Sequence, residues 1–468
     1  METTRRALFL ATAAAAALPT LRAQAATSDD PWARARAIRA RIRAPHIASR
    51  DFLITHFGAV GEGQHDCTSA VRDAINAANA AGGGRVVVPA GRWKTGAVHL
   101  KSNVDLHLMR GATLAFDQNP QAYLPLVRTR FEGVECMNYS PLIYAYEQEN
   151  IAITGAGLID GGADNDHWWS WKGRLDAGWT QGMPHQGDAR TRLFQMAEDN
   201  VPVEQRIMGE GSYLRPNFIE PTRCRNVRLE GVSLKGSPMW QVHPVLCQNV
   251  IVRGLHIDGG GGPNTDGCDP ESCSDVLIEN CVFNTGDDCI AIKSGRNADG
   301  RRLATPSQNI LIRNCTMLDG HGALTIGSEI SGGVRNVFAE NCTMSSPHLD
   351  HAIRFKDNFT RGGVLEHFYF RNIRVGQVAH AVLTVDFHYE EGAAGGHQPV
   401  LRDVLIEGLA SGASPHAIDA EGLPGAVVSD IILRNCDFAG VAGANIVEHV
   451  DNLHFENVRI NGQPAQQT

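Results

Sequence analysis

Lysine and aromatic residues are scarce in this sequence. Six of its 468 residues are lysine, and Phe, Trp and Tyr together make up 6%. Acidic residues outnumber basic ones by 51 to 42, and the net charge of −9 argues against a general nucleic-acid-binding protein. The 20% of charged residues argues against a disordered, collagen-like or membrane-embedded chain. No Cys/His spacing typical of a zinc site is present, so we expect no structural metal.

The first 25 residues have the pattern of an export signal. Arg5 and Arg6 precede a 15-residue apolar run over 7–21, and residues 23–25 (AQA) resemble a cleavage site. The run is too short to span a bilayer comfortably, so we expect no membrane insertion. The paired arginines favour a twin-arginine signal, with an ordinary secretory signal as the alternative. Removal of residues 1–25 would change the net charge from −9 to −11, and we expect an exported protein, periplasmic or extracellular.

Glycine is abundant, and a short motif repeats through most of the chain. The 49 glycines among 468 residues exceed the usual ~7%. The motif reads Asn or Asp, apolar, any residue, apolar, polar, Gly or Asn, then apolar or Cys. Its copies start at positions 226, 249, 275, 309, 336, 367, 403, 430 and 452, and looser copies start at 103 and 150. Each copy alternates with period two, which predicts one strand per copy.

A repeat of 22 to 36 residues made only of strands and turns predicts an all-β parallel β-helix, in which each repeat forms one turn. A propeller and leucine-rich repeats are the alternatives, but the Trp-Asp consensus and the leucine ladder are missing. We expect a single solenoid over 51–468, preceded by a helical extension over 26–50.

Two helices are expected near the N-terminus. Residues 68–81 have one apolar face, with Thr68 as the expected N-cap and the glycines at 82–84 as the stop. This helix would cap the end of the solenoid, whose hydrophobic edge needs covering. A second, basic helix over 31–44 is expected to pack through Ile38 and Ile42.

Four of the eleven cysteines recur at one position of the repeat, namely Cys281, Cys315, Cys342 and Cys436. Equivalent positions of successive turns stack in columns about 4.8 Å apart. We therefore expect these four residues to form a buried column of free thiols rather than disulfides.

Four polar clusters follow the repeat starts in four successive repeats. They are Asn264-Thr265-Asp266, Gly286-Asp287-Asp288, Gly320-His321-Gly322 and Arg354-Phe355-Lys356. Their residues Asp266, Asp287, His321 and Arg354 lie 12 to 18 residues after the repeat starts, so we expect the clusters in one column. Four turns of the solenoid span about 15 Å, which suits a few sugar units along a groove.

The residue types in these clusters fit the hydrolysis of an acidic glycoside. Three clustered carboxylates cannot all ionise freely, so one is expected to hold a proton, and the set then contains an acid and a base. Arg354 and Lys356 share one face of a strand and would give an acidic protein a local site for a substrate carboxylate. His321 can donate a hydrogen bond to a neighbouring carboxylate and tune it.

In this order the four clusters resemble the signature motifs of glycoside hydrolase family 28, the polygalacturonases. The stretches ITHFGAVGEGQHDCTSA from Ile54 and GGGRVVVPAGRWKTG from Gly82 are also similar to this family, so the resemblance covers about residues 50–460. It implies a right-handed β-helix, hydrolysis of α-1,4-galacturonan with inversion, and no metal or other cofactor. The roles that it implies are Asp287 as general acid, Asp266 and Asp288 as activators of water, His321 as support for the acid, and Asn264, Arg354 and Lys356 as substrate-binding residues.

Adjacent strand residues point to opposite faces, so Asp287 and Asp288 can both face the groove only if the backbone bends. We therefore predict a turn or bulge at 286–288. Asp288 would not serve as a base if it were buried with partners of its own.

Further candidates come from neighbouring segments. His243 and Lys293 are expected to bind substrate, because they lie near the clusters along the repeats, and the family resemblance implies that Tyr389 contacts substrate as well. Trp240 and Arg296 are weaker candidates for the same groove.

A long insertion separates the repeat starts at 150 and 226. It contains four Trp residues, at 168, 169, 171 and 179, and the segment YLRPNFIEP at 213–221. Loops of this length in compact folds are usually functional. The sequences around the motifs look most like bacterial exo-polygalacturonases, so we expect a monomeric enzyme that acts on pectin or polygalacturonate from the non-reducing end.

Other functions remain open. Within the family they are an endo-polygalacturonase and a rhamnogalacturonan or xylogalacturonan hydrolase. Outside it they are a calcium-dependent pectate lyase, which would give an unsaturated product, and a non-catalytic β-helix adhesin.

Overall fold

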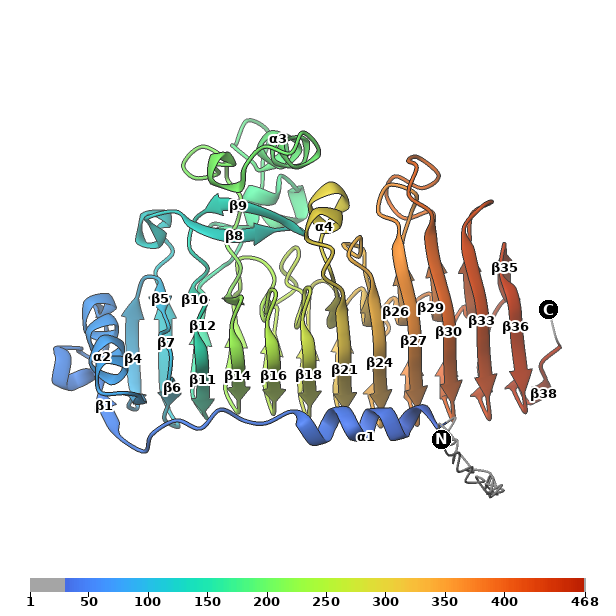
Figure 1. Ribbon diagram of the computed structural model, residues 1–468, viewed down its shortest axis with the longest axis horizontal. Helices are drawn as coiled ribbons and strands as arrows, with labels where there is room; N and C mark the ends of the chain where they lie inside the picture. Colours follow the sequence, from blue (N-terminus) through green and yellow to red (C-terminus); the bar gives the residue numbers. More distant parts are fainter. Residues whose placement is uncertain (1–29, 467–468) are drawn as a thin grey trace, which may run out of the picture.

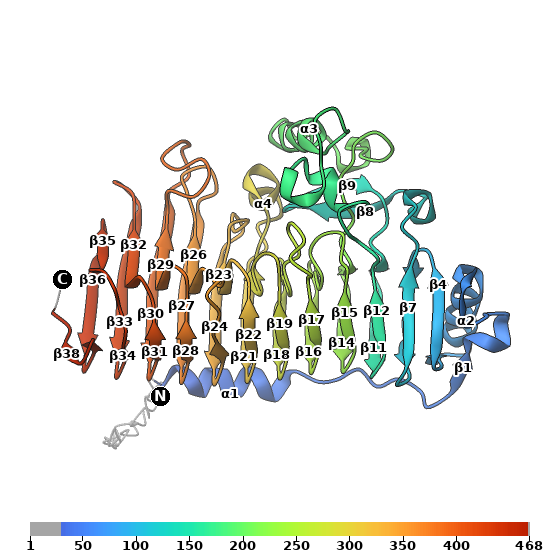
Figure 2. The same cartoon turned by 180° about the vertical axis from the view of Figure 1, so that it is seen from behind.

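The computed structural model describes residues 30–466, which wind into a long right-handed parallel β-helix (Figure 1). The strands of successive turns lie side by side along the whole molecule, as the view from behind also shows (Figure 2). The fold predicted from the repeats is therefore confirmed. The predicted signal peptide over 1–25 lies outside the described residues. Within 30–466, no helix has the length and apolar character needed to cross a membrane.

Every full copy of the repeat motif forms a strand of the first sheet. This parallel sheet has 13 strands within the described residues. They are β1 (Asp51–Leu53), β3 (Gly84–Val88), β6 (Val104–Leu108), β11 (Glu149–Gly155), β14 (Arg225–Glu230), β16 (Gln248–Arg253), β18 (Ser274–Glu279), β21 (Ser307–Arg313), β24 (Val334–Glu340), β27 (Gly363–Arg371), β30 (Pro399–Glu407), β33 (Val427–Arg434) and β36 (Asp451–Glu456).

A second sheet follows the first in each turn of the solenoid. It is parallel apart from its last pair of strands, which is antiparallel. Its strands are β2 (Glu62–Asp66), β4 (Gly91–Thr95), β7 (Ala112–Phe116), β12 (Leu158–Asp160), β15 (Ser233–Lys235), β17 (His256–Asp258), β19 (Val282–Asn284), β22 (Thr316–Asp319), β25 (Thr343–Met344), β28 (Arg374–Gln377), β31 (Ala410–Ala413), β34 (Asp437–Phe438), β37 (Arg459–Ile460) and β38 (Gln463–Pro464).

The third side of the solenoid is thinned in its middle. It consists of a three-stranded and a six-stranded parallel sheet, which within residues 30–466 are joined by two series of isolated bridges, one through Val242 and Cys268 and one through Val245 and Glu271. The strands are β5 (Val98–His99), β10 (Ile143–Tyr146) and β13 (Ile219–Thr222), then β20 (Ile290–Ile292), β23 (Gly322–Ile326), β26 (His351–Lys356), β29 (Ala381–Asp386), β32 (His416–Glu421) and β35 (Ile446–Glu448). The second of the two bridged turns carries the first polar cluster, Asn264-Thr265-Asp266.

The first residue of each repeat forms a corner of the solenoid. At all eleven repeat starts the backbone is left-handed, with φ between 55° and 66°. Asn and Asp adopt this conformation more readily than other side chains except glycine. Their amides also bond along the column: Asn226 Nδ2 donates to Asn150 Oδ1 at 2.9 Å, and Asn249 Nδ2 donates to Asn226 Oδ1 at 2.7 Å. The corner conformation therefore explains why the repeat begins with Asn or Asp.

All eleven cysteines are buried and free, as predicted for the column that starts at Cys281. A second column of thiols was not predicted. In it the N–H of Cys224 approaches Sγ of Cys247, and the N–H of Cys247 approaches Sγ of Cys273, each at 3.4 Å. Both columns fill the core with small apolar groups.

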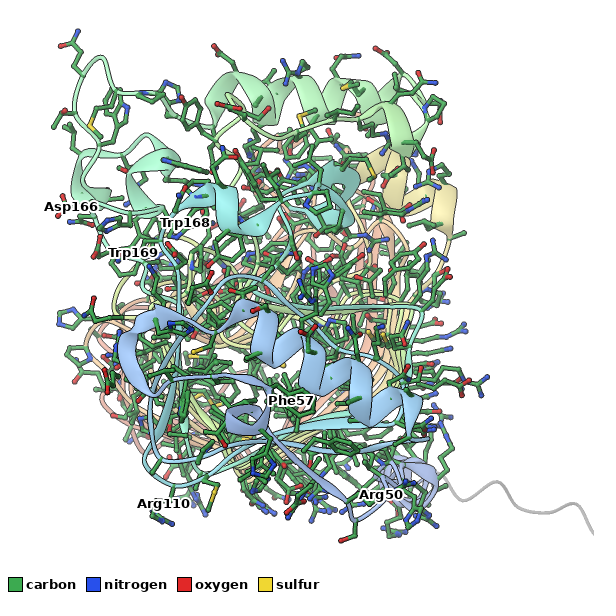
Figure 3. All side chains as sticks on the ribbon, turned by 90° about the vertical axis from the view of Figure 1, so that its left-hand side faces the viewer. Arg50, Phe57, Arg110, Asp166, Trp168 and Trp169 are labelled. Carbon is green, nitrogen blue, oxygen red and sulfur yellow. The ribbon has the colours of Figure 1, made fainter. Side chains whose placement is uncertain are left out.

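Two helices cover parts of the solenoid, as predicted. α1 (Pro31–Arg41) lies along the outer face of the first sheet (Figure 1), where Ile38 and Ile42 are buried. α2 (Thr68–Ala80) covers the N-terminal end, as the view along the axis shows (Figure 3). The prediction of Thr68 as N-cap is wrong: Cys67 occupies that position, and Asp66 Oδ1 accepts the hydrogen bond from the N–H of Thr68.

A group of short elements gathers above the middle of the solenoid (Figure 1). It combines part of the predicted insertion with a hairpin that precedes it, β8 (Val127–Phe131) and β9 (Val134–Asn138). α3 packs against β9 and against a helix from a later turn. The helical elements are η3 (Trp169–Lys172), η4 (Leu175–Ala177), α3 (Gly187–Glu198), η5 (Val203–Gln205) and α4 (Asn297–Leu303), while η1 (Ile54–Phe57) and η2 (Pro120–Tyr123) lie nearer the N-terminal end.

Candidate active site

Three carboxylates converge on the third side of the solenoid, next to its thinned region. Oxygen atoms of Asp266, Asp287 and Asp288 lie within 4.8 Å of one another. All three residues line a cavity of about 150 Å³. Asp287 and Asp288 lie between β19 and β20, where residues 285–289 leave the strand conformation. The turn predicted at 286–288 is therefore confirmed, and it allows both residues to reach the cavity.

Asp266 is a buried carboxylate of this cluster with a raised pKa. Burial and the neighbouring charges of Asp269 and Asp287 raise the pKa of Asp266 well above its usual range. Its Oδ1 atom is buried and has no hydrogen-bond partner among the described residues. Its Oδ2 atom lies 3.8 Å from Lys293 Nζ, and the residue lines the cavity.

Asp287 and His321 form a charged pair at the edge of the cavity. The two atoms Nδ1 of His321 and Oδ1 of Asp287 are 3.1 Å apart. Burial opposes ionisation of Asp287, but the hydrogen bond and the charge of His321 hold its pKa well below the usual range. The same hydrogen bond raises the pKa of His321 to about 9. The imidazole of His321 is 48% exposed to solvent.

Asp288 differs from the expectation. Its side chain is buried, Oδ2 accepts a hydrogen bond from Lys356 Nζ at 2.7 Å, and Oδ1 accepts one from Thr325 Oγ1 at 3.0 Å. Because Asp288 is buried with hydrogen-bond partners of its own, we do not assign it the role of a base. In this structure it is the residue that anchors Lys356.

The two cations of the fourth cluster share one face of β26, as expected. Lys356 Nζ lies 5.1 Å from the ring centroid of Tyr389, and the guanidinium of Arg354 lies 5.5 Å from it. Tyr389 and Lys356 line the cavity, and Arg354 lies beside Tyr389. Among residues 30–466, Arg354 has one long contact with a carboxylate, 3.6 Å from Nη2 to Asp386 Oδ2.

The four clusters do not form one column, which corrects the prediction. Cys268 and Ile290 are bridged neighbours in adjacent turns. Asp266 and Asp288 each lie two residues before one of them, so these two aspartates share a column. In the third sheet Ile290 pairs with Leu324, and Leu324 pairs with Ile353. The position equivalent to Asp288 is therefore 351, and Arg354 lies three residues beyond it. Connections of different length before the third sheet cause the shift.

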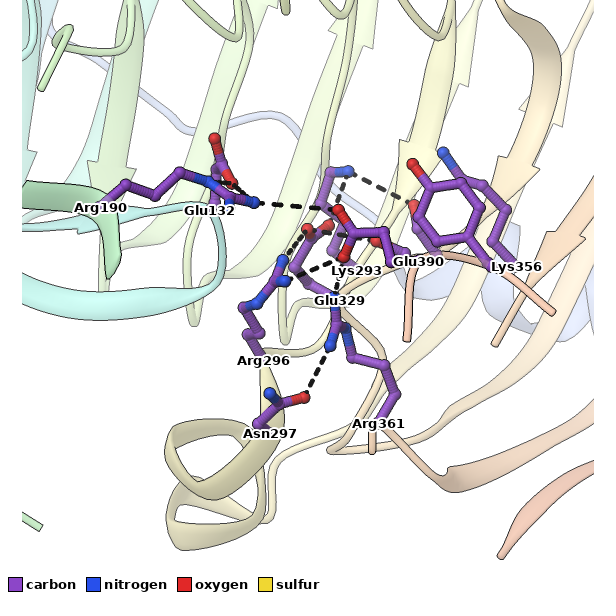
Figure 4. Close-up of polar contacts among 12 residues, drawn as sticks. Glu132, Arg190, Lys293, Arg296, Asn297, Glu329, Lys356, Arg361 and Glu390 are labelled. Atoms are coloured by element: carbon purple, nitrogen blue, oxygen red, sulfur yellow. Dashed lines mark hydrogen bonds and ion pairs between the residues drawn. The ribbon is translucent and has the colours of Figure 1, made fainter. Parts of the chain in front are cut away.

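Lys293 and Arg296 are neutralised by carboxylates of the protein. Lys293 is buried, with Nζ 3.1 Å from Glu329 and 3.8 Å from Asp266. Its ammonium also lies over the ring of Trp240, 4.3 Å from the centroid. Arg296 pairs with Glu329 at 3.4 Å (Figure 4). Lys293 and Trp240 line the cavity, whereas Arg296 supports its wall.

His243 does not reach the cavity, which corrects its prediction as a substrate-binding residue. The side chain is fully buried. Nε2 lies 2.8 Å from Glu271 Oε2, and Nδ1 lies 3.0 Å from Asn217 Nδ2. Since both ring nitrogens bond to protein groups, His243 is part of a buried polar network.

Several cavity residues were not found from the sequence. Glu132 stands at the turn between β8 and β9, and Arg190 of α3 donates to its Oε2 at 2.7 Å. Arg190 also lies 3.8 Å from Glu390, in the loop over 387–398, so the two sides meet at the cavity (Figure 4). The length of the insertion indicated a functional segment, but nothing in the sequence singled out these side chains.

Arg215 holds Asn264 in place and was also missed. Its guanidinium donates to Asn264 Oδ1 at 2.8 Å and to the carbonyl oxygen of Pro263 at 2.6 Å. Burial lowers the pKa of Arg215 to about 10. Asn264 Nδ2 in turn lies 3.4 Å from Asp287 Oδ2, so Arg215 positions a partner of the central carboxylate.

The chain is similar to known polygalacturonases in sequence and in structure. A family model described as "Glycosyl hydrolases family 28" matches residues 208–455. The chain is 44% identical to a hyperthermoactive exopolygalacturonase from Thermotoga maritima of known structure, with a TM-score of 0.90 and coverage of 93% of this chain and 97% of that chain. It is 26% identical over 446 residues to an exo-poly-alpha-D-galacturonosidase from Dickeya chrysanthemi, covering 88% of this chain and 72% of the relative. It is 29% identical over 401 residues to a probable polygalacturonase from Vitis vinifera, covering 81% and 74%.

Proposed function

Because the chain belongs to glycosyl hydrolase family 28, we propose that it hydrolyses α-1,4-galacturonosidic bonds of polygalacturonate from the non-reducing end. The main support is a cavity in which Asp266, Asp287 and Asp288 converge, and which is walled by the insertion and the 387–398 loop. A walled pocket admits a chain end more readily than the middle of a polymer. The exo-acting relatives from Thermotoga maritima and Dickeya chrysanthemi support the same mode of action.

In the proposed reaction the Asp287–His321 pair supplies the acid. The pair holds one proton across its 3.1 Å contact, and this proton passes through Asp287 to the glycosidic oxygen as the C1–O bond breaks. His321 then shares in reprotonating Asp287. This keeps the role that the family resemblance implies for Asp287, although its carboxylate is ionised in the free site.

We assign activation of water to Asp266, whose Oδ1 is unpartnered and which lines the cavity. The water oxygen bonds to C1, and its proton passes to the carboxylate of Asp266. Asp266 can accept this proton only after losing its own, so the reaction requires a pH at which the raised pKa of this group is passed. Asp288 fixes Lys356, which with Arg354 and Tyr389 would bind the galacturonate carboxylate on the other side of the bond.

The stereochemistry of the proposal rests on the family resemblance. The carboxylate oxygens lie within 4.8 Å of one another, closer than the ~6.5–9.5 Å between carboxyl groups of most inverting glycosidases. NMR of the first product decides the question: inversion of an α-linkage gives the β-anomer first, and retention gives the α-anomer.

The mode of cleavage is tested by following viscosity and reducing ends together on polygalacturonate. We expect slow loss of viscosity, early release of galacturonate or its dimer, and no activity in the Asp287→Asn variant. Rapid loss of viscosity at low release would mean endo cleavage. A product absorbing in the ultraviolet that depends on calcium would instead identify a lyase.

We further propose that the protein is exported, on the basis of its first 25 residues, and that it acts as a monomer. Fractionation of cells and the mass of the purified protein in solution test these two statements.

A further inference from the structure

Lys172 is a cation of the cavity wall without a partner. It is the last residue of η3, in the insertion, and it lines the same cavity as Asp266 and Asp287. Within residues 30–466, its ammonium makes no hydrogen bond or ion pair. An ammonium can donate three hydrogen bonds, so Lys172 has unused donors in the cavity.

The other cations of the cavity are already paired. Lys293 lies 3.1 Å from Glu329, Lys356 lies 2.7 Å from Asp288, and Arg190 donates to Glu132 at 2.7 Å. Each of these pairs is held by the folded protein before a ligand arrives. Among the cations that line the cavity, Lys172 is therefore the one that is available to pair with an anionic ligand.

The surroundings of Lys172 favour the arrival of a carboxylate. Burial lowers the pKa of Lys172, and Glu132 and Asp287 act to raise it. The nearby cations Arg215 and Arg190 lower this pKa further and add positive charge around the site. A ligand carboxylate at Lys172 would replace lost water contacts with a charge-assisted hydrogen bond. Since Lys172 belongs to the insertion, its ligand would be the sugar unit nearest that wall.

We propose that Lys172 binds the carboxylate of the terminal galacturonate unit, the one that is released, and makes the enzyme require a free acid there. Lys172 thus determines specificity for the terminal unit, whereas Arg354 and Lys356 serve the unit beyond the cleaved bond. The inference rests on the proposed exo cleavage in this pocket.

Two trigalacturonates test the inference, one fully acidic and one methyl-esterified only at its non-reducing end. In Lys172→Met we expect kcat/KM on the acidic trimer to fall about 10- to 100-fold, since one charged hydrogen bond is lost. On the esterified trimer the variant should equal the wild type within about twofold. Lys172→Arg should keep most of the discrimination. The matched control is Lys235→Met, which removes an exposed lysine whose partner is Asp160.

A parallel fall on both trimers would overturn the inference, because a merely structural role lowers both activities alike. Unchanged discrimination in Lys172→Met would overturn it as well. If the wild-type enzyme releases no galacturonate from the non-reducing end of the acidic trimer, the proposed function itself fails. The wild-type product pattern therefore separates the two failures.

Discussion

At the scale of single residues, the proton shared by Asp287 and His321 sets the alkaline limit of activity. The acid must be protonated to act, so activity is lost as the pH rises through the pKa of about 9 of His321. In His321→Gln the remaining carboxylic acid loses its proton at lower pH. We expect the alkaline limb of kcat/KM to move down by more than one pH unit, with kcat about 10- to 100-fold lower. A pH–rate profile measures both effects.

The fall of kcat/KM at low pH reports protonation of the base. Two variants show whether this base is Asp266 or Asp288. Asp266→Asn should lower kcat at least ~100-fold, since the group that accepts the proton of water is lost. Asp288→Asn should instead raise KM about 10-fold and change kcat less than fivefold, because it releases Lys356. If Asp288→Asn abolishes kcat at unchanged KM, Asp288 is the base despite its burial.

The sequence identified the charged residues of the motifs but not their pairing. Asp288 and Lys356 are 68 positions apart, and their contact at 2.7 Å depends on how two turns of the solenoid are offset. The shift of Arg354 by three positions has the same origin, because connection lengths differ from turn to turn. Burial of His243 could not be predicted, since its partners Glu271 and Asn217 are not part of the repeat pattern.

At the scale of elements, the left-handed corners made the first sheet predictable. Ten of the eleven corners are Asn or Asp and the other is His367, so the motif marks the start of each strand. The hairpin over 127–138 lacks such a marker. Its two-residue turn, Glu132-Gly133, has φ of 44° and 82°, a conformation in which Asn or Asp usually precedes Gly. Glu132 therefore gave no turn signal, and an important wall of the site was missed.

Substitutions at one corner test this account of the repeat. Asn226 has φ of 57° and makes two bonds in the amide column. Asn226→Ala loses both bonds and forces alanine into the left-handed region, so we expect the free energy of unfolding to fall by about 2–4 kcal/mol. Asn226→Gly loses the bonds alone and should cost about half as much. Equal losses in urea titrations of the two variants would exclude backbone strain as a contributor.

At the scale of the whole molecule, α1 binds to strands that follow it by more than 200 positions. Ile38 is buried against an apolar group on the outer face of the first sheet that includes Leu311 and Phe338. We expect Ile38→Ala to lower the free energy of unfolding by about 2–5 kcal/mol and to leave kcat unchanged, since α1 does not line the cavity. The exposed Arg36 on the same helix is the control, and Arg36→Ala should change stability by less than ~0.5 kcal/mol.

The wall between the insertion and the 387–398 loop also fixes the order in which the two products leave. In the proposed exo cleavage, the released sugar would lie at the inner end of the pocket, behind the shortened chain. The chain must therefore dissociate before the sugar can escape. Such an enzyme is distributive: it makes one cut per encounter, and free galacturonate competes with the polymer for the same inner position.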